Sequence, residues 1–330
     1  MARGTVMKRR EFIIGSACGV GAAWLGAKGF AAASPHKFSA SDTVAIGKTG
    51  IKTSRLAMGT GTVGVGHHSN QTGLGLKGLS ELLLNGYDHG LRFFDAADSY
   101  GSHPHVAEAL KHVQRDQVTV LTKTWARDPA TARADLDRFR KELGTDYLDI
   151  CLMHCLTEGD WTERYRGVMD VFSEAKEKGI IRAHGCSCHS IEALRAAAKS
   201  PWVEVDLARI NPIGSHMDAD PATVVSVLRE MRAAGKGVIG MKILGQGDMR
   251  TRQDEALKYA LSLDVLDAFT IGAESTAEQE DLIRRIERTV ASGQWSVVSD
   301  QCEPVNSKLA LGAGIGCSVL HWAAPGNVWF

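Results

Sequence analysis

The chain has 330 residues, of which 44% are hydrophobic and only 6% aromatic, with 38 basic and 38 acidic side chains. This is the composition of an ordinary soluble protein, long enough to bury one large core or two smaller ones. Lysine and arginine are scattered, and no aromatic residues are interleaved among them, so nothing indicates a nucleic-acid groove or a membrane-binding face. A small molecule is therefore the expected partner.

The first 33 residues differ in composition from the rest of the chain. They have a basic start at Lys8–Arg10, a weakly apolar middle rich in glycine and alanine, and small residues at Ala31–Ala33. This pattern is typical of an export signal, and the Arg9-Arg10 pair before Glu11 resembles the twin-arginine type, which moves proteins that have already folded. We expect export by the twin-arginine machinery and cleavage before Ser34. The mature protein is then expected in the periplasm or otherwise outside the cytosol, with no stable membrane span after processing. An uncleaved anchor is the alternative.

The predicted mature chain is mildly acidic and keeps six of the seven cysteines. It has 33 basic and 37 acidic side chains, a net charge of −4. No CxxC pair is present, which argues against a thioredoxin-like motif, and the cysteine spacing of a ferredoxin cluster is also missing. In an oxidising compartment Cys302 and Cys317 are candidates for a disulfide, although spacing alone does not establish one.

Short β-prone runs alternate with amphipathic stretches from Leu56 onward. The eight runs are residues 55–61, 91–97, 118–124, 147–154, 181–187, 203–210, 237–244 and 267–273. They begin at intervals of roughly 25 to 35 residues, which is the length of one repeated βα unit. Residues 130–144 and 162–179 have apolar side chains at helical spacing and end on a glycine that can cap a helix.

Eight such units favour a closed (β/α)8 barrel over a doubly wound sheet. The first strand is not followed by GxxxxGK[ST], and we interpret the glycine-rich residues 59–66 as a loop rather than a phosphate cradle. The predicted barrel domain covers residues 34–293. Residues 294–330 do not continue the pattern and are left as an unplaced C-terminal tail.

Catalytic groups of such a barrel lie at the carboxyl ends of its strands. The second strand ends at Asp95 and leads to Tyr100, the third ends at Lys123, and the fourth ends at His154. A phenol of pKa near 10 is a poor acid at neutral pH unless a nearby cation stabilises its phenolate, and Lys123 supplies that cation. Asp95 would hold the lysine, and His154 could bind a substrate carbonyl, so the four residues make one proton-transfer unit.

At this point the chain resembles the aldo-keto reductase family, from about residue 47 to residue 288. The segments IGKTGIKTSRLAMGTGT, GLRFFDAADSYG, VLTKTW and TDYLDICLMH are similar to the family's opening and to its three catalytic segments. The resemblance implies a catalytic tetrad of Asp95, Tyr100, Lys123 and His154, with Tyr100 as general acid when NADP(H) or NAD(H) exchanges hydride with a small carbonyl or alcohol substrate. Asp98 is then a structural residue.

The same resemblance implies the cofactor-binding residues, and here the sequence departs from the family pattern. The segment GCSCHS keeps Ser187 but has Cys188 in place of an asparagine, while Leu207 replaces a glutamine and Met241 replaces the tyrosine that stacks on the nicotinamide. On the eighth strand Ala273 and Gln279 stand where basic residues are usual, and Glu274 favours a ribose hydroxyl over a 2′-phosphate. The implied cofactor-binding set is Gly59, Thr60, Gly61, Ser187, Met241, Gly245, Gly272, Glu274, Ser275 and Gln279.

Two other classes of protein stay open. The loop residues His67, His68, His103, His105, Cys155, Cys188 and His189 could supply ligands for a metal-dependent hydrolase or lyase on the same barrel, although no metal ligand set is assigned. The second alternative is a non-catalytic binding barrel that keeps the tetrad by descent. Binding of a dinucleotide would distinguish the oxidoreductase from both. The sequence identifies neither the substrate nor the oligomeric state.

Overall fold

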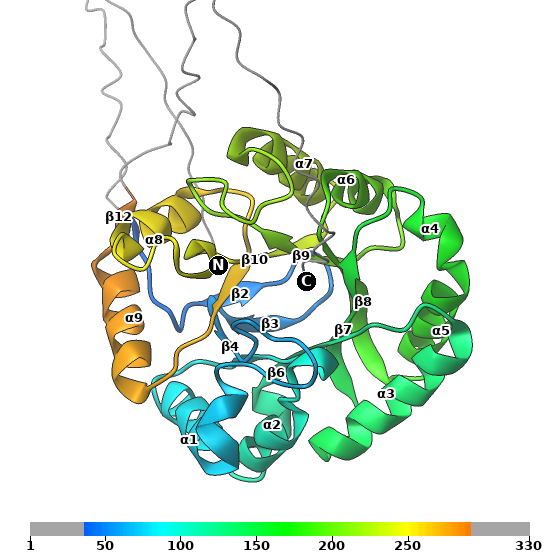
Figure 1. Cartoon of the computed structure of the whole chain (residues 1–330), viewed down its shortest axis with the longest axis horizontal. Helices are drawn as coiled ribbons and strands as arrows, with labels where there is room; N and C mark the ends of the chain where they lie inside the picture. The colour runs from blue at the N-terminus through cyan, green and yellow to red at the C-terminus, as the bar shows by residue number, and fades with distance from the viewer. Residues whose placement is uncertain (1–35, 292–330) are drawn as a thin grey trace, which may run out of the picture. The chain divides into compact units, whose positions relative to one another are not determined.

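The structure, a computed structural model, describes residues 36–291 (Figure 1). The predicted export signal of residues 1–33, the tail of residues 294–330, and Cys302 with Cys317 all lie outside the described residues. None of the helices within residues 36–291 is long and apolar enough to cross a membrane.

Eight parallel strands close into a barrel, as the spacing of the β-prone runs predicted. Each strand pairs with the next one along the chain, and the last returns to pair with the first through Phe269 and Leu56. The strands are β4 (Leu56–Gly59), β5 (Phe93–Asp95), β6 (Thr119–Thr124), β7 (Leu148–Leu156), β8 (Ile181–Cys188), β9 (Val205–Arg209), β10 (Gly237–Met241) and β11 (Ala268–Ile271). The (β/α)8 barrel is therefore confirmed.

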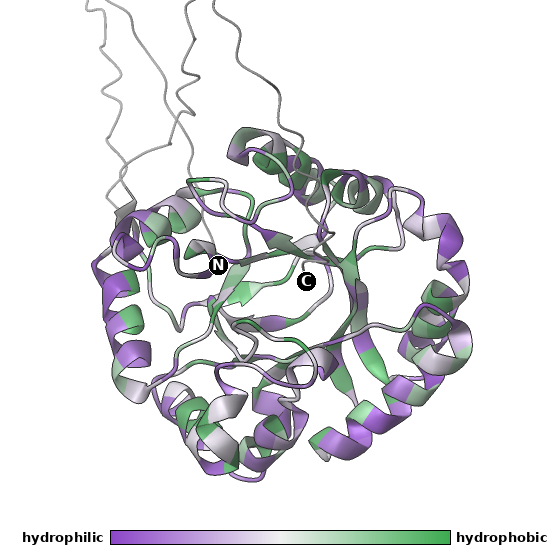
Figure 2. Cartoon of the chain, in the orientation of Figure 1, coloured by the Kyte–Doolittle hydropathy of each residue, from purple (hydrophilic) through white to green (hydrophobic). Residues whose placement is uncertain are grey.

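Helices surround the barrel in a ring (Figure 1). They are α1 (Gly75–Asp88), α2 (His103–Leu110), α3 (Pro129–Leu143), α4 (Trp161–Arg164), α5 (Arg166–Glu177), α6 (Ile191–Lys199), α7 (Pro221–Ala233), α8 (Gln253–Ser262) and α9 (Thr276–Arg288). Short 3-10 turns lie at η1 (Thr72–Leu74), η2 (Asp98–Tyr100), η3 (Arg115–Gln117) and η4 (Gly245–Gly247). Figure 2 shows green, apolar stretches on the helices alternating with purple, polar ones, as expected of helices that cover a core on one side.

The two predicted helices show how local signals set the boundaries. Helix α3 begins after Asp128, whose carboxylate accepts the Thr131 amide at 2.9 Å, and ends at Gly144, which has a φ of 64°. Both features are standard helix caps. The second stretch, predicted as continuous, is divided at Tyr165 into α4 and α5. Apolar periodicity did not reveal this division, because both pieces keep their apolar side chains on the core side.

The core has two layers, one inside the barrel and one between strands and helices. The interior layer includes Phe93, Leu121 and Ile150, and the outer layer is larger. An antiparallel hairpin of β2 (Thr43–Ala45) and β3 (Lys52–Ser54) precedes the barrel, and its Ile46 and Ile51 are fully buried in the interior layer. The sequence analysis did not predict this hairpin. A further short pair joins β1 (His36–Lys37) to β12 (Val290–Ala291).

Asp149, which is fully buried on β7, connects three neighbouring strands. Its Oδ2 accepts the Val120 amide of β6 at 2.9 Å and lies 2.8 Å from the Arg115 guanidinium, and its Oδ1 accepts from Arg182 of β8 at 2.7 Å. The two cations and the amide offset the free-energy cost of burying the carboxylate. Removal of the carboxylate would leave all three groups without this partner.

We therefore expect Asp149→Ala to lower the free energy of unfolding by about 3 kcal/mol. Urea denaturation of the purified protein measures this loss. The matched control is Asp170→Ala, because Asp170 is 68% exposed and its one ion pair within residues 36–291 is with Arg166 on its own helix. Its effect should stay within about 0.5 kcal/mol. Equal effects of the two substitutions would contradict the role given to Asp149.

Candidate active site

The centre of the site is a buried ion pair at the carboxyl ends of β5 and β6. Lys123 is fully buried, and its Nζ lies 2.6 Å from Asp95 Oδ1 and 2.8 Å from the Ala96 carbonyl oxygen. The other oxygen of Asp95 accepts from Thr270 Oγ1 of β11 at 2.8 Å. Asp95 is thus bonded to Lys123 through one oxygen and to Thr270 through the other, and these contacts hold the lysine ammonium in place.

Tyr100 lies directly over this pair. The Lys123 ammonium is 4.6 Å from the centroid of the tyrosine ring. Burial raises the pKa of Tyr100, and although the Lys123 charge acts in the opposite direction, as the sequence analysis expected, burial has the larger effect. The pKa of Lys123 is lowered by burial but raised more by Asp95 and Tyr100. Both groups therefore carry their protons at neutral pH, and the phenol can donate one.

The glycine-rich loop after β4 gives Tyr100 its place. A Cβ on Gly61 would lie 2.2 Å from the tyrosine ring, and one on Gly64 would lie 2.3 Å from it. No side chain fits at either position while the ring stays where it is. Gly61 and Gly64 therefore allow close packing on the tyrosine, a role that was not predicted from the sequence.

His154 completes the group of four. Its ring meets that of Tyr100 edge to face, with 5.7 Å between centroids, and its Nδ1 is 3.4 Å from Ser99 Oγ. Burial, followed by the charge of Lys123, lowers the pKa of His154 well below its usual range, so the imidazole is neutral. The structure thus brings all four predicted tetrad residues together. Strand β7 continues two residues beyond His154, the strand end predicted from the sequence.

A cavity of about 350 Å³ opens beside the tetrad. It is bounded by Asp95 and Tyr100 and extends past the ends of β9, β10 and β11, over Leu207 and Met241. Of the predicted cofactor-binding residues, five line it, namely Gly59, Gly61, Met241, Gly272 and Glu274. At its far edge the Glu274 carboxylate accepts from Asn70 Nδ2 at 2.6 Å.

The other five predicted cofactor residues do not line this cavity. Thr60 is buried, with its hydroxyl 2.8 Å from the Asp95 carbonyl oxygen, and Ser187 is buried with its Oγ accepting the Cys155 amide at 2.9 Å. Gly245 lies in η4, and Ser275 caps α9 by accepting the Glu278 amide. Gln279 is buried on α9, where it accepts from Asn85 of α1 at 2.8 Å.

Within residues 36–291 two groups of side chains are close enough to share an ion, and of the candidate metal ligands they include His103 and Cys188. His103 is buried between Glu142, at 2.7 Å, and Thr122, also at 2.7 Å. Asp98, His103 and Glu142 are close enough to share an ion, but the Arg138 guanidinium already contacts Asp98 and Glu142 at 2.7 and 2.9 Å. This contact also gives Asp98 the structural role that was predicted for it.

A second possible group of ligands is buried on the outside of the barrel wall. The Sγ atoms of Cys186 and Cys188 are 3.8 Å apart, and Cys186 lies 3.4 Å from Asp206 Oδ1. Burial raises the pKa of Asp206 to about 7. Cys186 and Cys188 belong to the core layer between strands and helices, so this group lies away from the cavity at the tetrad.

Several functional candidates at the mouth were missed. Arg209 ends β9, and Lys242 follows directly on β10, where it lines the cavity. Arg209 Nε lies 2.9 Å from Asp218 Oδ1, and Arg127 donates to the His154 carbonyl oxygen at 2.7 Å. These residues could have been found from the sequence. Asp95, Lys123 and His154 were identified because each lies at the end of a predicted strand, and the same criterion applied to β9 and β10 identifies Arg209 and Lys242.

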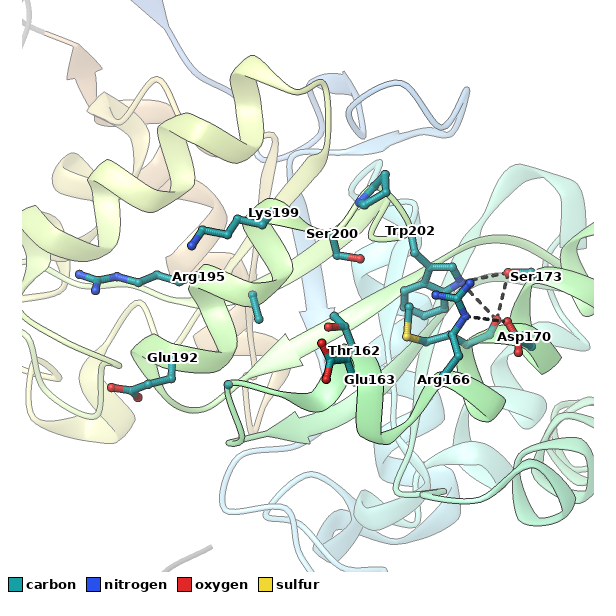
Figure 3. A pocket seen from close by; sticks show the side chains of 14 residues that line it. Thr162, Glu163, Arg166, Asp170, Ser173, Glu192, Arg195, Lys199, Ser200 and Trp202 are labelled. Atoms are coloured by element: carbon teal, nitrogen blue, oxygen red, sulfur yellow. Dashed lines mark hydrogen bonds and ion pairs between the residues drawn. The ribbon is translucent and has the colours of Figure 1, made fainter.

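A larger hollow, of about 880 Å³, lies elsewhere, on the outside of the barrel (Figure 3). It is an open groove beside α5 and α6, with Trp202 in its wall, where Trp202 Nε1 donates to Ser173 Oγ at 3.0 Å. Its ionisable side chains, such as Arg166 and Glu192, are surface residues, and no tetrad residue reaches it. The smaller cavity is therefore the better candidate, because it combines buried titratable groups with an apolar floor.

A barrel with a buried Lys-Asp pair under a tyrosine, beside a neutral histidine, is the arrangement that the catalytic segments predicted. Residues 55–298 match the profile of the family described as "Aldo/keto reductase family". Because this match covers more than half of the sequence, the chain belongs to the aldo/keto reductase family.

Individual relatives match only in part. The chain is 30% identical over 157 residues to (1S)-1,7-diacetoxy-luvungin A aldo-keto reductase of Citrus sinensis, covering 40% of this chain and 49% of that protein. It is 28% identical over 167 residues to an NADH-specific methylglyoxal reductase of Escherichia coli, covering 44% and 51%. The chain thus spans about half the length of these relatives. An aldo-keto reductase structure from Bacillus halodurans, in its holo form, has a TM-score of 0.64 at 17% identity over 78% of this chain and 93% of that chain, which supports the fold.

Proposed function

We propose that the protein is an NAD(P)H-dependent oxidoreductase that reduces a small carbonyl compound, with Tyr100 as the proton donor. The observation that carries this proposal is the position of Tyr100 over the buried Lys123–Asp95 pair, at the edge of a cavity with an apolar floor. Family membership supports it, and two related proteins bear names that specify NADH or NADPH as cofactor.

The residues that line the cavity can contact the parts of a nicotinamide dinucleotide, although they are not the usual side chains. Leu207 and Met241 give an apolar surface for a flat ring, and Glu274 lies at the other end, after β11. A reduced nicotinamide held there would supply a hydride to the carbonyl carbon. Methionine packs well against aromatic rings, so Met241 can replace the stacking tyrosine of the family.

The chain's own residues then complete the reduction. The phenol of Tyr100 gives its proton to the carbonyl oxygen as the C=O bond becomes an alcohol, and the cofactor is oxidised. Lys123 stabilises the phenolate that Tyr100 becomes, while Asp95 keeps the lysine in place. His154, being neutral, can donate a hydrogen bond to the carbonyl oxygen without competing for the proton.

Tyr100→Phe tests this assignment most directly. It keeps the ring packed on Gly61 and Gly64 but removes the proton, so kcat for aldehyde reduction should fall by about 100-fold or more. Tryptophan-fluorescence titration with NADPH and NADH should still show cofactor binding. Unchanged kcat would contradict the role of Tyr100, and a wild-type protein that binds neither nucleotide would favour a non-catalytic barrel.

We further propose that NADH is preferred to NADPH. The Glu274 carboxylate faces the cavity edge, where it can accept a hydrogen bond from a ribose hydroxyl but repels a 2′-phosphate. Ala273 and Gln279 provide no positive charge there, and Gln279 is turned toward α1.

Accordingly, Glu274→Lys should shift the ratio of NADPH to NADH affinity toward NADPH by about tenfold or more, because an attraction replaces a repulsion. Both dissociation constants come from the fluorescence titration. Glu280→Lys makes the same charge change on the exposed side of α9 and serves as the control. An unchanged ratio in Glu274→Lys would show that the ribose lies elsewhere.

Export is the third part of the proposal and rests on the sequence of residues 1–33. Since the twin-arginine route carries folded proteins, a cofactor bound before export would leave the cytosol with the enzyme. We expect a full-length chain with Arg9→Lys and Arg10→Lys to stay in the cytosolic fraction, while the unaltered chain is found outside it as a shorter product beginning at Ser34. Cell fractionation and N-terminal sequencing measure both, and identical distribution of the two chains would contradict the signal.

A further inference from the structure

Three cations gather on one side of the mouth, around the residue that follows His154. They are Lys242 directly after β10, Arg127 in the loop after β6, and Arg209 at the end of β9, here called the cationic subsite. All three charges lower the pKa of the Cys155 thiol, against the larger effect of burial, and the Arg127 guanidinium is 3.4 Å from the Cys155 carbonyl oxygen. The proton-transfer unit described above uses none of the three.

The backbone holds Lys242 in an unusual conformation. Its φ is 56°, which is uncommon for a side chain larger than glycine and costs free energy. Its carbonyl oxygen accepts from the buried Asn211 Nδ2 at 3.2 Å and from the Gly245 amide at 2.9 Å. These bonds fix the conformation in which the Lys242 side chain lines the same cavity as Tyr100.

The charges at this mouth do not cancel. Lys123 is paired with Asp95, and Arg209 is paired with Asp218. Within residues 36–291, however, Lys242 makes no ion pair, and the hydrogen bonds of Arg127 go to the carbonyl oxygens of residues 126, 154 and 155 only. Two positive charges are left without a carboxylate.

Neighbouring groups respond to this positive field. The pKa of His189, after β8, is lowered to about 3 by burial and by Arg209 and Lys242, so it stays neutral and adds no charge. Burial and Arg209 also lower the pKa of Lys242, to about 8, so that it is mostly charged at pH 7. A partly buried cation next to other cations is stabilised most by an anion.

We propose that the cationic subsite binds a carboxylate of the substrate, so that the preferred substrates are oxo acids rather than neutral aldehydes or ketones. This inference rests on the proposed function. Within the subsite Arg127 donates to the backbone carbonyl oxygens of His154 and Cys155, and Lys242 lines the cavity together with Tyr100. Glu274 and Asn70 lie at the end assigned to the ribose. A carbonyl group at Tyr100 and a carboxylate at Lys242 would therefore fit within one small molecule.

The experiment compares 4-formylbenzoate with its neutral methyl ester as substrates. In the wild type kcat/KM should be higher for 4-formylbenzoate, and Lys242→Met should reduce this preference at least about tenfold, mainly through KM. Lys242→Arg keeps the charge and should keep the preference. Lys77→Met removes an 87% exposed lysine and should change neither substrate. Because the Lys242 charge is lost as pH rises through its pKa of about 8, the wild-type preference should decline from pH 7 to pH 9.

Calorimetric titration of 4-formylbenzoate without cofactor separates this inference from the proposed function. Binding that weakens in Lys242→Met but not in Lys242→Arg supports the subsite even if neither aldehyde is turned over, in which case the oxidoreductase proposal fails alone. Equal kcat/KM for the two aldehydes, or no binding of 4-formylbenzoate, would overturn the subsite. So would a Lys242→Met variant whose only change is a higher KM for NADH or NADPH, because the lysine would then bind the cofactor diphosphate.

Discussion

The contact between Lys123 and Asp95 is the interaction on which the rest of the site depends. An unpaired ammonium at this depth would be very costly, and the pair is compensated only because β5 and β6 are neighbours whose register sets Asp95 opposite Leu121, two residues before Lys123. Thr270 of β11 donates a hydrogen bond to the other carboxylate oxygen, so Asp95 on β5 is also bonded to the last strand of the barrel. Tyr100 can lie on the ammonium because two glycines leave room for its ring. The strand register, the packing of Tyr100 and the proposed proton transfer therefore all involve this one ion pair.

Much of this could be predicted from the sequence, for a physical reason. Barrel strands are short buried runs at regular spacing, and catalytic groups follow their carboxyl ends, so Asp95, Lys123 and His154 could be found from position alone. The break at Tyr165 could not be predicted, because a helix divided by one residue keeps its apolar face. The burial of Thr60, Ser187 and Gln279 depends on which way each side chain turns at a strand or helix end, and a resemblance to a family does not specify this direction.

The mouth also shows how one barrel can keep its reaction centre while its surroundings change. Buried contacts among four strands hold the tetrad. These contacts do not depend on the residues that would bind a cofactor or a substrate. Leu207 and Met241 give the cavity an apolar floor, and Lys242, next to Met241, adds a cation to its lining. In the proposed function, ligand preference would therefore be set by side chains that take no part in holding the tetrad.

The hairpin of β2 and β3 has a further consequence for how ligands reach the site. Its Ile46 and Ile51 pack among the residues of the barrel interior and are 0% and 1% exposed, so the amino-terminal end of the barrel is sealed. The cavity beside Tyr100 lies at the opposite end, over Leu207 and Met241. In the proposed function, the dinucleotide and the substrate would therefore both enter and leave through the mouth at the carboxyl ends of the strands.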